Sequence, residues 1–283
     1  MDLLNNYTSL QKSKYFQKNK LKYTLFIGSH LFLWLGSKNM SSLKSKVAIV
    51  TGSSRGIGRA IAERLGQDGA SIVVTYAGNR DKAEEVVAKI QASGSPAIAL
   101  QADVRNLTDV QALFDNTLSH FGKIDILVNN AAGKNIFKPT SELTLEDYDS
   151  MFDIARGVYF ALQQAALHLE NNGRIISLST SGTVMPIPTG GAYAGFKAAI
   201  EQFSASLAKE IGFKGITVNT ISPGVTATDG LVLDKAQVDQ LIAQTPLGRL
   251  GQPTDVADAV ALLVSERAGW ITGQHIRANG GIV

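Results

Sequence analysis

A tyrosine and a lysine in the last third of the chain have the spacing of a general acid/base pair. Tyr193 precedes Lys197 by four residues, in the stretch GGAYAGFK. Residues four apart on a helix share one face, so the two side chains would be neighbours. An ammonium beside a phenol favours the phenolate, which lowers the phenol pKa toward the range needed for proton exchange with a substrate. Because this spacing is common on helix surfaces, its context decides what it means.

A second group of residues has the spacing of a phosphate-binding loop. TGSSRGIG follows the apolar run KVAIV and contains Gly52, Gly56 and Gly58. Glycines let the backbone turn tightly and approach a pyrophosphate, whose charge is met by backbone N–H groups at the start of the next helix. The motif lies between a predicted strand and a helix that begins near Arg59, which is the context that supports a dinucleotide site.

The residues after the second predicted strand indicate which dinucleotide binds. An NAD site places an acidic side chain there, on the adenosine ribose, but this strand is followed by Gly78 and Asn79. Together with Arg55 and Arg80, this corner favours the 2′-phosphate of NADP(H). Asp81 is the counter-argument, because a shift of one residue would bring an acid to the ribose, and NAD(H) therefore stays an alternative.

The elements that must position these groups are short apolar strands and helices in alternation. From Lys46 onward the apolar runs are KVAIVTG, SIVVTY, AIALQADV, IDILVNNA, RIISLST and GITVNTISPG, and helix-length segments separate them. Runs that are apolar on both faces are typical of a parallel sheet covered on both sides. We therefore predict a single-domain Rossmann-type α/β fold, a doubly wound parallel sheet with helices on both faces, over residues 45–283.

The composition excludes several kinds of site. The chain has no cysteine, so disulfides, thiolate metal sites and cysteine nucleophiles are absent. Its four histidines stand far apart without ligand spacing, and we predict no metal site. Eight lysines and one acidic residue fall within residues 1–46, so the rest of the chain is net acidic and nothing indicates nucleic-acid binding.

The N-terminal segment, residues 1–44, differs from the rest. Its lysines precede an apolar run from Tyr23 to Gly36, which is too short for an ordinary membrane span and lacks a small-x-small cleavage site. We expect a poorly ordered extension, with two interpretations: an upstream start ahead of Met40, or a weak membrane anchor.

Six motifs occur together and in order over Lys46 to Val283: TGSSRGIG, ADV, LVNNA, YAGFK, VNTISPG and ITGQHIRANGG. In this the chain resembles the short-chain dehydrogenase/reductase family, close to its bacterial 3-oxoacyl-carrier-protein reductase and glucose-dehydrogenase-like members. The resemblance implies a cytoplasmic NAD(P)-dependent oxidoreductase acting on a small carbonyl or alcohol. It also implies a homodimer or homotetramer built from the helices that carry Tyr193 and Tyr159. A fold of this kind does not specify the substrate.

The resemblance also implies roles for particular residues. Tyr193 would exchange the proton with the substrate oxygen, helped by the positive charge of oxidised nicotinamide, and Lys197 would also bind the nicotinamide ribose. Asp103 and Val104 would border the adenine. The nicotinamide carboxamide would be held by the turn that contains Pro223, Gly224, Thr226 and Thr228. The whole predicted cofactor set is Gly52, Ser54, Arg55, Gly56, Ile57, Gly58, Asn79, Asp103, Val104, Asn130, Ala131, Tyr193, Lys197, Pro223, Gly224, Thr226 and Thr228.

The family adds a hydroxyl that holds the substrate oxygen, commonly thirteen residues before the tyrosine. That position is Thr180, while Ser181 is twelve before and Ser179 fourteen before. Each can donate a hydrogen bond to an alkoxide. We rank Ser181 and Thr180 nearly equal and Ser179 third, against the alternative that all three satisfy loop backbone groups.

Three departures from the family pattern concern the proton relay and local packing. Ile154 stands three residues before Gly157, where relatives often have an asparagine that opens a water path to the lysine. NNAAGKN is one residue longer than the usual turn, which would displace Ala132 or Gly133. Phe196 replaces a small residue before the lysine, so its ring needs a space or forces repacking.

Two functions follow from this sequence. The first is an NADP(H)-dependent oxidoreductase that moves hydride between nicotinamide and a carbonyl or alcohol, with Tyr193 as general acid/base and Lys197, Thr180 or Ser181 beside it. The alternative, motivated by Ile154 and Phe196, is an NADP(H)-binding protein with impaired catalysis that acts as a sensor or an interaction partner.

Overall fold

The computed structural model describes residues 43–231 and 233–283. The predicted N-terminal extension falls almost entirely on residues 1–42, which lie outside the described residues. Within them, Leu43 is buried and its N–H donates to Asp68 O over 2.7 Å, so the packed unit includes Leu43, two residues ahead of the predicted boundary. None of the helices in the described part of the chain is long and apolar enough to cross a membrane.

The described residues form seven strands. They are β1 (Val47–Val50), β2 (Ser71–Tyr76), β3 (Ala97–Gln101), β4 (Ile126–Asn129), β5 (Arg174–Leu178), β6 (Thr217–Pro223) and β7 (His275–Ala278). All neighbours are parallel, in the order β3-β2-β1-β4-β5-β6-β7. The strand order reverses direction between β1 and β4, and in open α/β sheets ligands bind at the carboxyl ends beside such a switch point.

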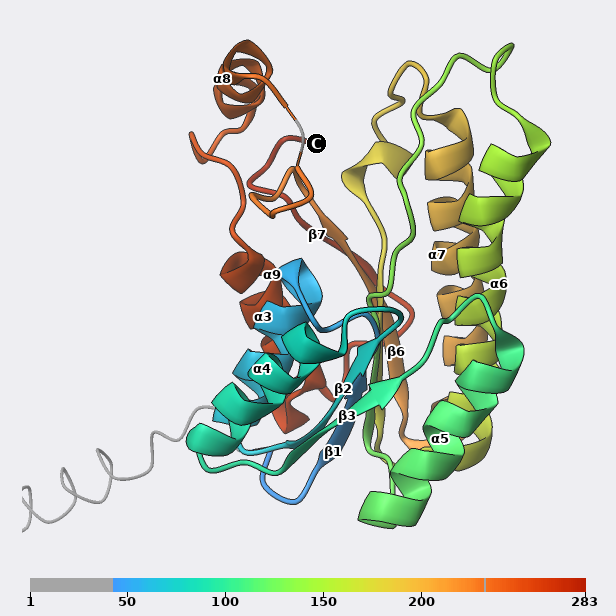
Figure 1. Cartoon of the computed structure of the whole chain (residues 1–283), viewed down its shortest axis with the longest axis vertical. Helices are drawn as coiled ribbons and strands as arrows, with labels where there is room; N and C mark the ends of the chain where they lie inside the picture. Colours follow the sequence, from blue (N-terminus) through green and yellow to red (C-terminus); the bar gives the residue numbers. More distant parts are fainter. Residues whose placement is uncertain (1–42, 232) are drawn as a thin grey trace, which may run out of the picture. The chain divides into compact units, whose positions relative to one another are not determined.

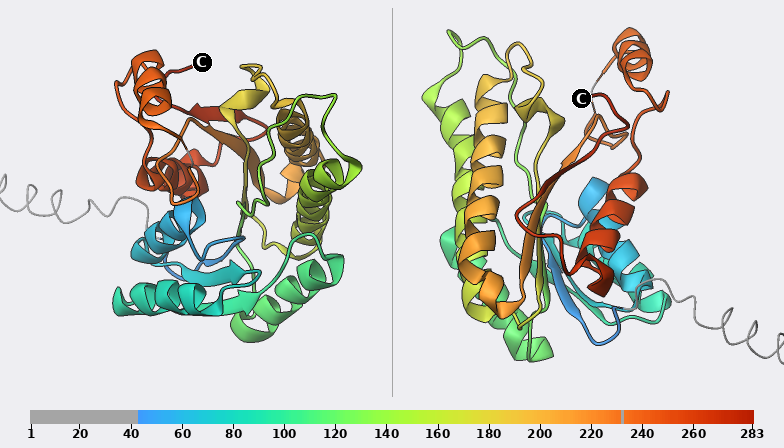
Figure 2. Two further views of the ribbon diagram at one scale, coloured as in Figure 1. Left: turned by 45° about the horizontal axis from the view of Figure 1, so that its top comes forward. Right: turned by 180° about the vertical axis from the view of Figure 1, so that it is seen from behind.

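Seven α-helices and three short 3₁₀ turns connect the described strands. The helices are α3 (Gly56–Gln67), α4 (Arg80–Ala92), α5 (Leu107–Phe121), α6 (Leu145–His168), α7 (Gly191–Ile211), α8 (Lys235–Gln244) and α9 (Pro253–Val264). Figure 1 and the two views of Figure 2 show α3, α4 and α9 on one face of the sheet and α5, α6 and α7 on the other. The predicted doubly wound α/β fold is therefore confirmed.

The sheet separates two apolar clusters because alternate strand residues point to opposite faces. On the first face, Val50 and Ile176 pack with α3, α4 and α9. On the second, Ile49 and Ile175 pack with α5, α6 and α7. The strands are buried on both faces, which accounts for the continuous apolar runs seen in the sequence.

Candidate active site

The glycine loop after β1 is pressed against the end of β4. Gly52 has a φ of +62°, and a Cβ atom on it would lie 2.8 Å from the Cα of Ala131. Gly56, with a φ of +56°, begins α3, and its N-cap residue Arg55 makes no side-chain capping bond. The first N–H groups of α3 are thus left for a ligand, and the loop fits a pyrophosphate.

Asn130 ties this loop to the sheet. Its Nδ2 donates to Thr51 O over 2.9 Å and to Gly52 O over 3.1 Å. The backbone N–H groups of Asn130 and Ala131 both donate to Thr51 Oγ1 over 2.9 Å. In the longer turn that follows, a Cβ on Gly133 would lie 3.5 Å from the Ile154 side chain, so the inserted length brings this backbone against α6.

The two candidate arginines, Arg55 in the loop after β1 and Arg80 after β2, have different surroundings. Arg80 pairs with Glu84 over 3.4 Å on the surface of α4. Arg55 is exposed and forms no ion pair with any of the described residues. Asn79 caps α4, accepting the Lys82 N–H over 3.0 Å. Arg55 is therefore the arginine whose guanidinium is not engaged by an acid.

Asp103 and Val104 follow β3 at the same edge of the sheet. Arg105 bonds the Asp103 carboxylate at 2.5 Å and lowers its pKa. The Val104 carbonyl lies against Gly157 of α6, where a Cβ atom would approach Val104 O to 1.9 Å. A glycine in α6 is thus required for this segment to hold its position.

The segment after β6 reaches the glycine loop. A Cβ on Gly224 would meet the Asn279 backbone at 3.0 Å, and Thr226 Oγ1 donates to Gly224 O over 3.0 Å. Further along, the Thr228 methyl would lie 3.7 Å from a Cβ on Gly56. The fold thus brings together two segments that the sequence assigned to the cofactor site.

Tyr193 lies in the first turn of α7, beside the Thr180 hydroxyl. Burial raises the pKa of the Tyr193 phenol, and the Thr180 hydroxyl acts in the opposite direction. The net direction is opposite to the one predicted from the sequence, in which Lys197 lowered this pKa. The reason is that burial outweighs the charged and polar groups around the phenol in the protein alone.

Lys197 is buried, and its amine lies beside the end of β5. Its Nζ donates to Leu178 O over 2.9 Å and lies 5.4 Å from the centre of the Phe196 ring. Burial lowers the Lys197 pKa to about 8, while the negative charge of Glu201 acts to raise it. Such a lysine can gain or lose a proton near neutral pH.

The two other candidate hydroxyls point elsewhere. Ser181 Oγ donates to Pro223 O over 3.1 Å and accepts from Asn279 Nδ2 over 3.1 Å. Ser179 donates to the Glu201 carboxylate. Of the three hydroxyls, that of Thr180 is therefore the one beside the tyrosine.

Phe196 finds its space between α6 and α7. The ring is 1% exposed and stands edge-on to Tyr193, with ring centres 5.6 Å apart, and to Phe152, at 6.5 Å. A Cβ on Gly195 would lie 3.8 Å from the Phe152 ring, an ordinary van der Waals contact. Ile154 is buried in the same apolar cluster.

Two apolar side chains at the tyrosine were not singled out in the sequence. Phe137, on the loop after β4, has its ring centre 5.1 Å from that of Tyr193 and is 47% exposed. Ile187 is also exposed, and both contact the position of Gly190. No periodic pattern marks residues on irregular loops, which is why this apolar edge appears only in the structure.

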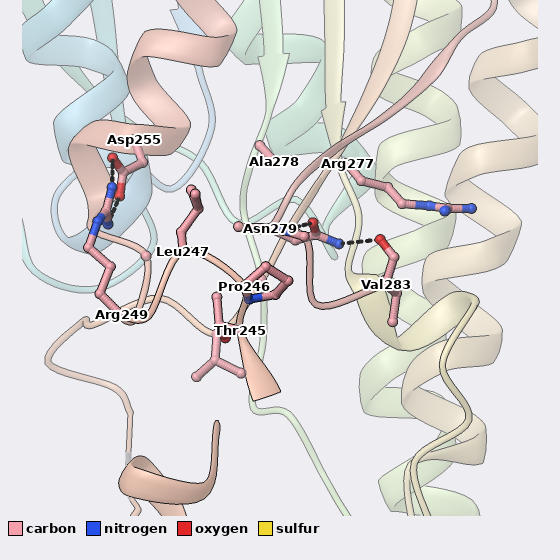
Figure 3. Close-up of a pocket in the computed structure, with 14 residues that line it drawn as sticks. Thr245, Pro246, Leu247, Arg249, Asp255, Arg277, Ala278, Asn279 and Val283 are labelled. Atoms are coloured by element: carbon pink, nitrogen blue, oxygen red, sulfur yellow. Dashed lines mark hydrogen bonds and ion pairs between the residues drawn. The ribbon is translucent and has the colours of Figure 1, made fainter. Parts of the chain in front are cut away.

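A pocket of ≈ 680 Å³ opens beside the site, between the loop after β6 and the C-terminal residues. Figure 3 shows Asn279 at its centre, Arg249 paired with Asp255 at one side, and Arg277 extending away. Tyr193 is not among its lining residues. The pocket joins the candidate active site through the hydrogen bond from Asn279 to Ser181.

The chain is similar to known oxidoreductases over most of its length. The family profile described as enoyl-(acyl carrier protein) reductase matches residues 52–283. An uncharacterized oxidoreductase of Methylorubrum extorquens is 44% identical over 86% of this chain and 100% of its own length. A hydroxynaphthalene reductase-like protein of Metarhizium guizhouense is 42% identical, covering 86% of this chain and 96% of that one.

Among solved structures, a short-chain dehydrogenase from Burkholderia cenocepacia in complex with NADP superimposes with a TM-score of 0.81. It is 39% identical, and the match covers 85% of this chain and 99% of that chain. The similarity therefore extends over the whole fold and not only over the glycine loop.

Proposed function

Since the chain belongs to the short-chain dehydrogenase/reductase family of oxidoreductases, we propose that it reduces a carbonyl group to an alcohol with NADPH. The observation that supports this most directly is the Thr180 hydroxyl beside the buried Tyr193 phenol, one helical turn from the buried Lys197. A hydroxyl, a phenol and an ammonium at the carboxyl edge of a Rossmann-type sheet are suited to hold and protonate a substrate oxygen.

The residues of the glycine loop would hold the cofactor. The N–H groups at the start of α3 would meet the pyrophosphate, and Arg55 would bind the 2′-phosphate. The absence of an acid directly after β2 and the unpaired state of Arg55 within the described chain support NADP(H) over NAD(H). The similar protein from Burkholderia cenocepacia was solved with NADP. When bound, the reduced nicotinamide supplies the hydride.

The side chains of this protein bind and protonate the oxygen of the substrate. Thr180 donates a hydrogen bond to the carbonyl oxygen, and Tyr193 protonates that oxygen as it gains negative charge. Burial raises the Tyr193 pKa, so the phenol carries its proton before the reaction. Lys197 places a positive charge near the phenolate that remains and thereby stabilises it.

We assign the substrate-holding hydroxyl to Thr180. Ser181 is engaged with Pro223 O and Asn279, and Ser179 with a carboxylate, so neither is directed at the phenol. The spacing of thirteen residues to Tyr193, which is common in the family, supports this assignment, although the sequence alone ranked Ser181 and Thr180 nearly equal.

Phe137 and Ile187 favour a flat, largely apolar carbonyl compound. Both side chains are exposed beside Tyr193 and would cover the rings of a bound aromatic ketone. The relative from Metarhizium guizhouense is named for hydroxynaphthalene reduction, which agrees with this chemistry.

The test is NADPH consumption by the full chain with a panel of aromatic ketones, quinones, acetoacetyl thioesters, aldehydes and sugars, with NADH in parallel. We expect turnover with an aromatic ketone or quinone, and loss of that turnover in Tyr193→Phe with NADPH affinity retained. Full activity in Tyr193→Phe would refute the mechanism. Tight NADPH binding without turnover across the panel would favour the alternative, a nucleotide-binding protein with impaired catalysis.

A further inference from the structure

The two sides of Lys197 differ in polarity. Toward α6 the lysine meets the Phe196 ring, and Ile154 is buried in the same apolar cluster at the position where relatives often have an asparagine. On the other side, Glu201 lies one turn further along α7, and its charge acts to raise the pKa of Lys197. Polar side chains therefore approach the lysine from the direction of β6 and β7.

Glu201 belongs to a chain of polar contacts made of hydrogen bonds and one ion pair. One carboxylate oxygen accepts from Ser179, and the other lies 3.4 Å from Nδ1 of His275, the first residue of β7. The Nε2 atom of His275 lies 2.5 Å from Ser222 Oγ on β6, and Ser222 Oγ lies 3.1 Å from Thr180 O. The Glu201 and His275 side chains are 18% and 26% exposed, so the network links the buried end of β5 to the surface.

Ser222, His275 and Glu201 have the order of a nucleophilic triad, but the serine is not placed for that chemistry. Ser222 is fully buried between neighbouring strands, where no substrate can reach its oxygen. A nucleophilic serine has to stand at an accessible surface beside its base. The three residues are therefore arranged to hold protons and not to attack a substrate.

The network can gain or lose one proton while its polar atoms stay hydrogen-bonded. With neutral imidazole, Nδ1–H donates to Glu201 and Nε2 accepts from the Ser222 hydroxyl. With imidazolium, Nε2–H donates to Ser222, whose hydroxyl then donates to Thr180 O instead. A rotation of one hydroxyl accommodates the proton.

The charged groups that face this network come from two elements. From α7 these are Lys197 and Glu201 themselves. From β7 they are His275 and Arg277, which is two residues further along the same side of the strand and exposed. The neighbouring strands β5 and β6 contribute the neutral hydroxyls of Ser179 and Ser222.

We propose that His275 and Glu201 form the proton path that resupplies Lys197, and through it Tyr193. This inference rests on the proposed function, in which Tyr193 gives one proton to the substrate oxygen in each turnover. A proton from solvent then binds His275, passes from Nδ1 to Glu201, and passes from the carboxyl group to the lysine amine, which reprotonates the phenolate. One proton enters for each proton that leaves with the alcohol.

The last transfer spans one turn of α7, from Glu201 to Lys197. Glu201 and Lys197 form no direct ion pair among the described residues, so the proton crosses through a water molecule or by rotation of the Glu201 side chain. Glu201 and His275 act through Lys197, since no contact in the described part of the chain joins either of them to Tyr193. They are positioning and relay residues, and their removal affects proton supply while the chemical step keeps its own groups.

The test uses Glu201→Gln and His275→Gln in the full chain, with Glu210→Gln, an exposed glutamate of the same helix, as matched control. We expect kcat for carbonyl reduction at pH 8 to fall about tenfold, which is less than the 10²- to 10⁴-fold effect of a group that transfers the proton directly. The KM for NADPH should stay unchanged. Added formate or imidazole should restore part of the lost rate, and the control should resemble the wild type.

Two outcomes would overturn the relay alone. The first is a kcat within twofold of the wild type in both variants at every pH. The second is a lower kcat that keeps the wild-type pH profile and is not rescued by formate or imidazole, because that pattern belongs to a structural defect. A wild-type protein that reduces no carbonyl would instead refute the proposed function, and the relay with it.

A measurement without turnover checks the network itself. In Glu201→Gln the amide N–H₂ faces Nδ1 of His275, so the neutral imidazole has to move its proton to Nε2. We expect ¹⁵N NMR of the free protein to show Nδ1 protonated in the wild type and Nε2 protonated in neutral Glu201→Gln. The same tautomer in both proteins would contradict the hydrogen-bonded arrangement on which the path depends.

Discussion

Gly157 of α6 lies directly against the carbonyl oxygen of Val104, where a Cβ atom on residue 157 would come within 1.9 Å of it. Because a contact this short cannot form, Gly157→Ala has to displace either α6 or the segment after β3. We expect a loss of about 1–3 kcal/mol in the free energy of unfolding and a higher Kd for NADPH, measured by denaturant unfolding and fluorescence titration.

Gly212→Ala is the matched control, because nothing lies within 4 Å of a Cβ at that position. It should unfold like the wild type and bind NADPH with the same affinity. Equal behaviour of the two alanine variants would show that the contact with Val104 does not constrain the cofactor site.

Thr180 and Ser181 should separate in their effects on turnover. Thr180→Val removes the hydroxyl beside Tyr193 and should lower kcat by about 10²- to 10³-fold, as expected for a donor to a developing oxyanion. Ser181→Ala removes the bonds to Pro223 and Asn279, and should cost about 1 kcal/mol of stability while most activity remains. The opposite ranking of kcat values would move the catalytic role to Ser181.

Arg55 should determine the preference between the two cofactors. Arg55→Ala is expected to raise the KM for NADPH by about tenfold or more while the KM for NADH changes little, because a charge-assisted bond to the 2′-phosphate is lost. Arg80→Ala, whose arginine already pairs with Glu84, should have the smaller effect. Initial rates with both cofactors decide this, and equal changes for NADPH and NADH would exclude the assigned role.

The buried Lys197 predicts an unusual dependence of stability on pH. Its amine loses the proton near pH 8 in the folded protein but near pH 10.5 in the unfolded chain. Between these values the unfolded chain binds more protons, so the contribution of this group to stability rises with pH. Below pH 8 the buried charge destabilises the protein by at most about 3 kcal/mol.

Lys197→Met should therefore be more stable than the wild type at pH 7, by about 1–2 kcal/mol once the lost hydrogen bond to Leu178 is included. The difference should shrink as the pH rises from 8 to 10.5. Lys209→Met, at an exposed position of the same helix, should show no such trend. Thermal unfolding of the cofactor-free proteins measures this, and a destabilised Lys197→Met at pH 7 would contradict the buried charge.

The sequence was sufficient for the fold because its strands are buried on both faces. Six of the seven strands stand out as apolar runs, from Val47–Val50 to Thr217–Pro223. The exception is β7, His275–Ala278, an edge strand whose residues are half-buried or exposed, so no apolar run marks it. Periodicity detects burial, and β7 has too little of it, whereas the opposite edge strand, β3, still stands out as an apolar run.

The site was predicted in its residue types but not in its orientations. Spacing placed Thr180, Ser181 and Tyr193 near one another, yet it could not tell which hydroxyl faces the phenol, because that depends on how the chain turns into the 3₁₀ segment Ser181–Thr183. The pair of Glu201 and His275 lies on α7 and β7, far apart in sequence. Only the folded sheet brings these two side chains together.

The side chains around Tyr193 are fixed by different interactions, and this difference determines which of them can be replaced to change the range of substrates. Thr180 and Lys197 are held by hydrogen bonds, so their replacement disturbs the reacting groups. Phe137 and Ile187 are exposed and held by packing alone in the described contacts, on loops that follow β4 and β5. A library confined to these two positions would reshape the entrance for bulkier or more polar ketones while the proton-transfer machinery stays in place.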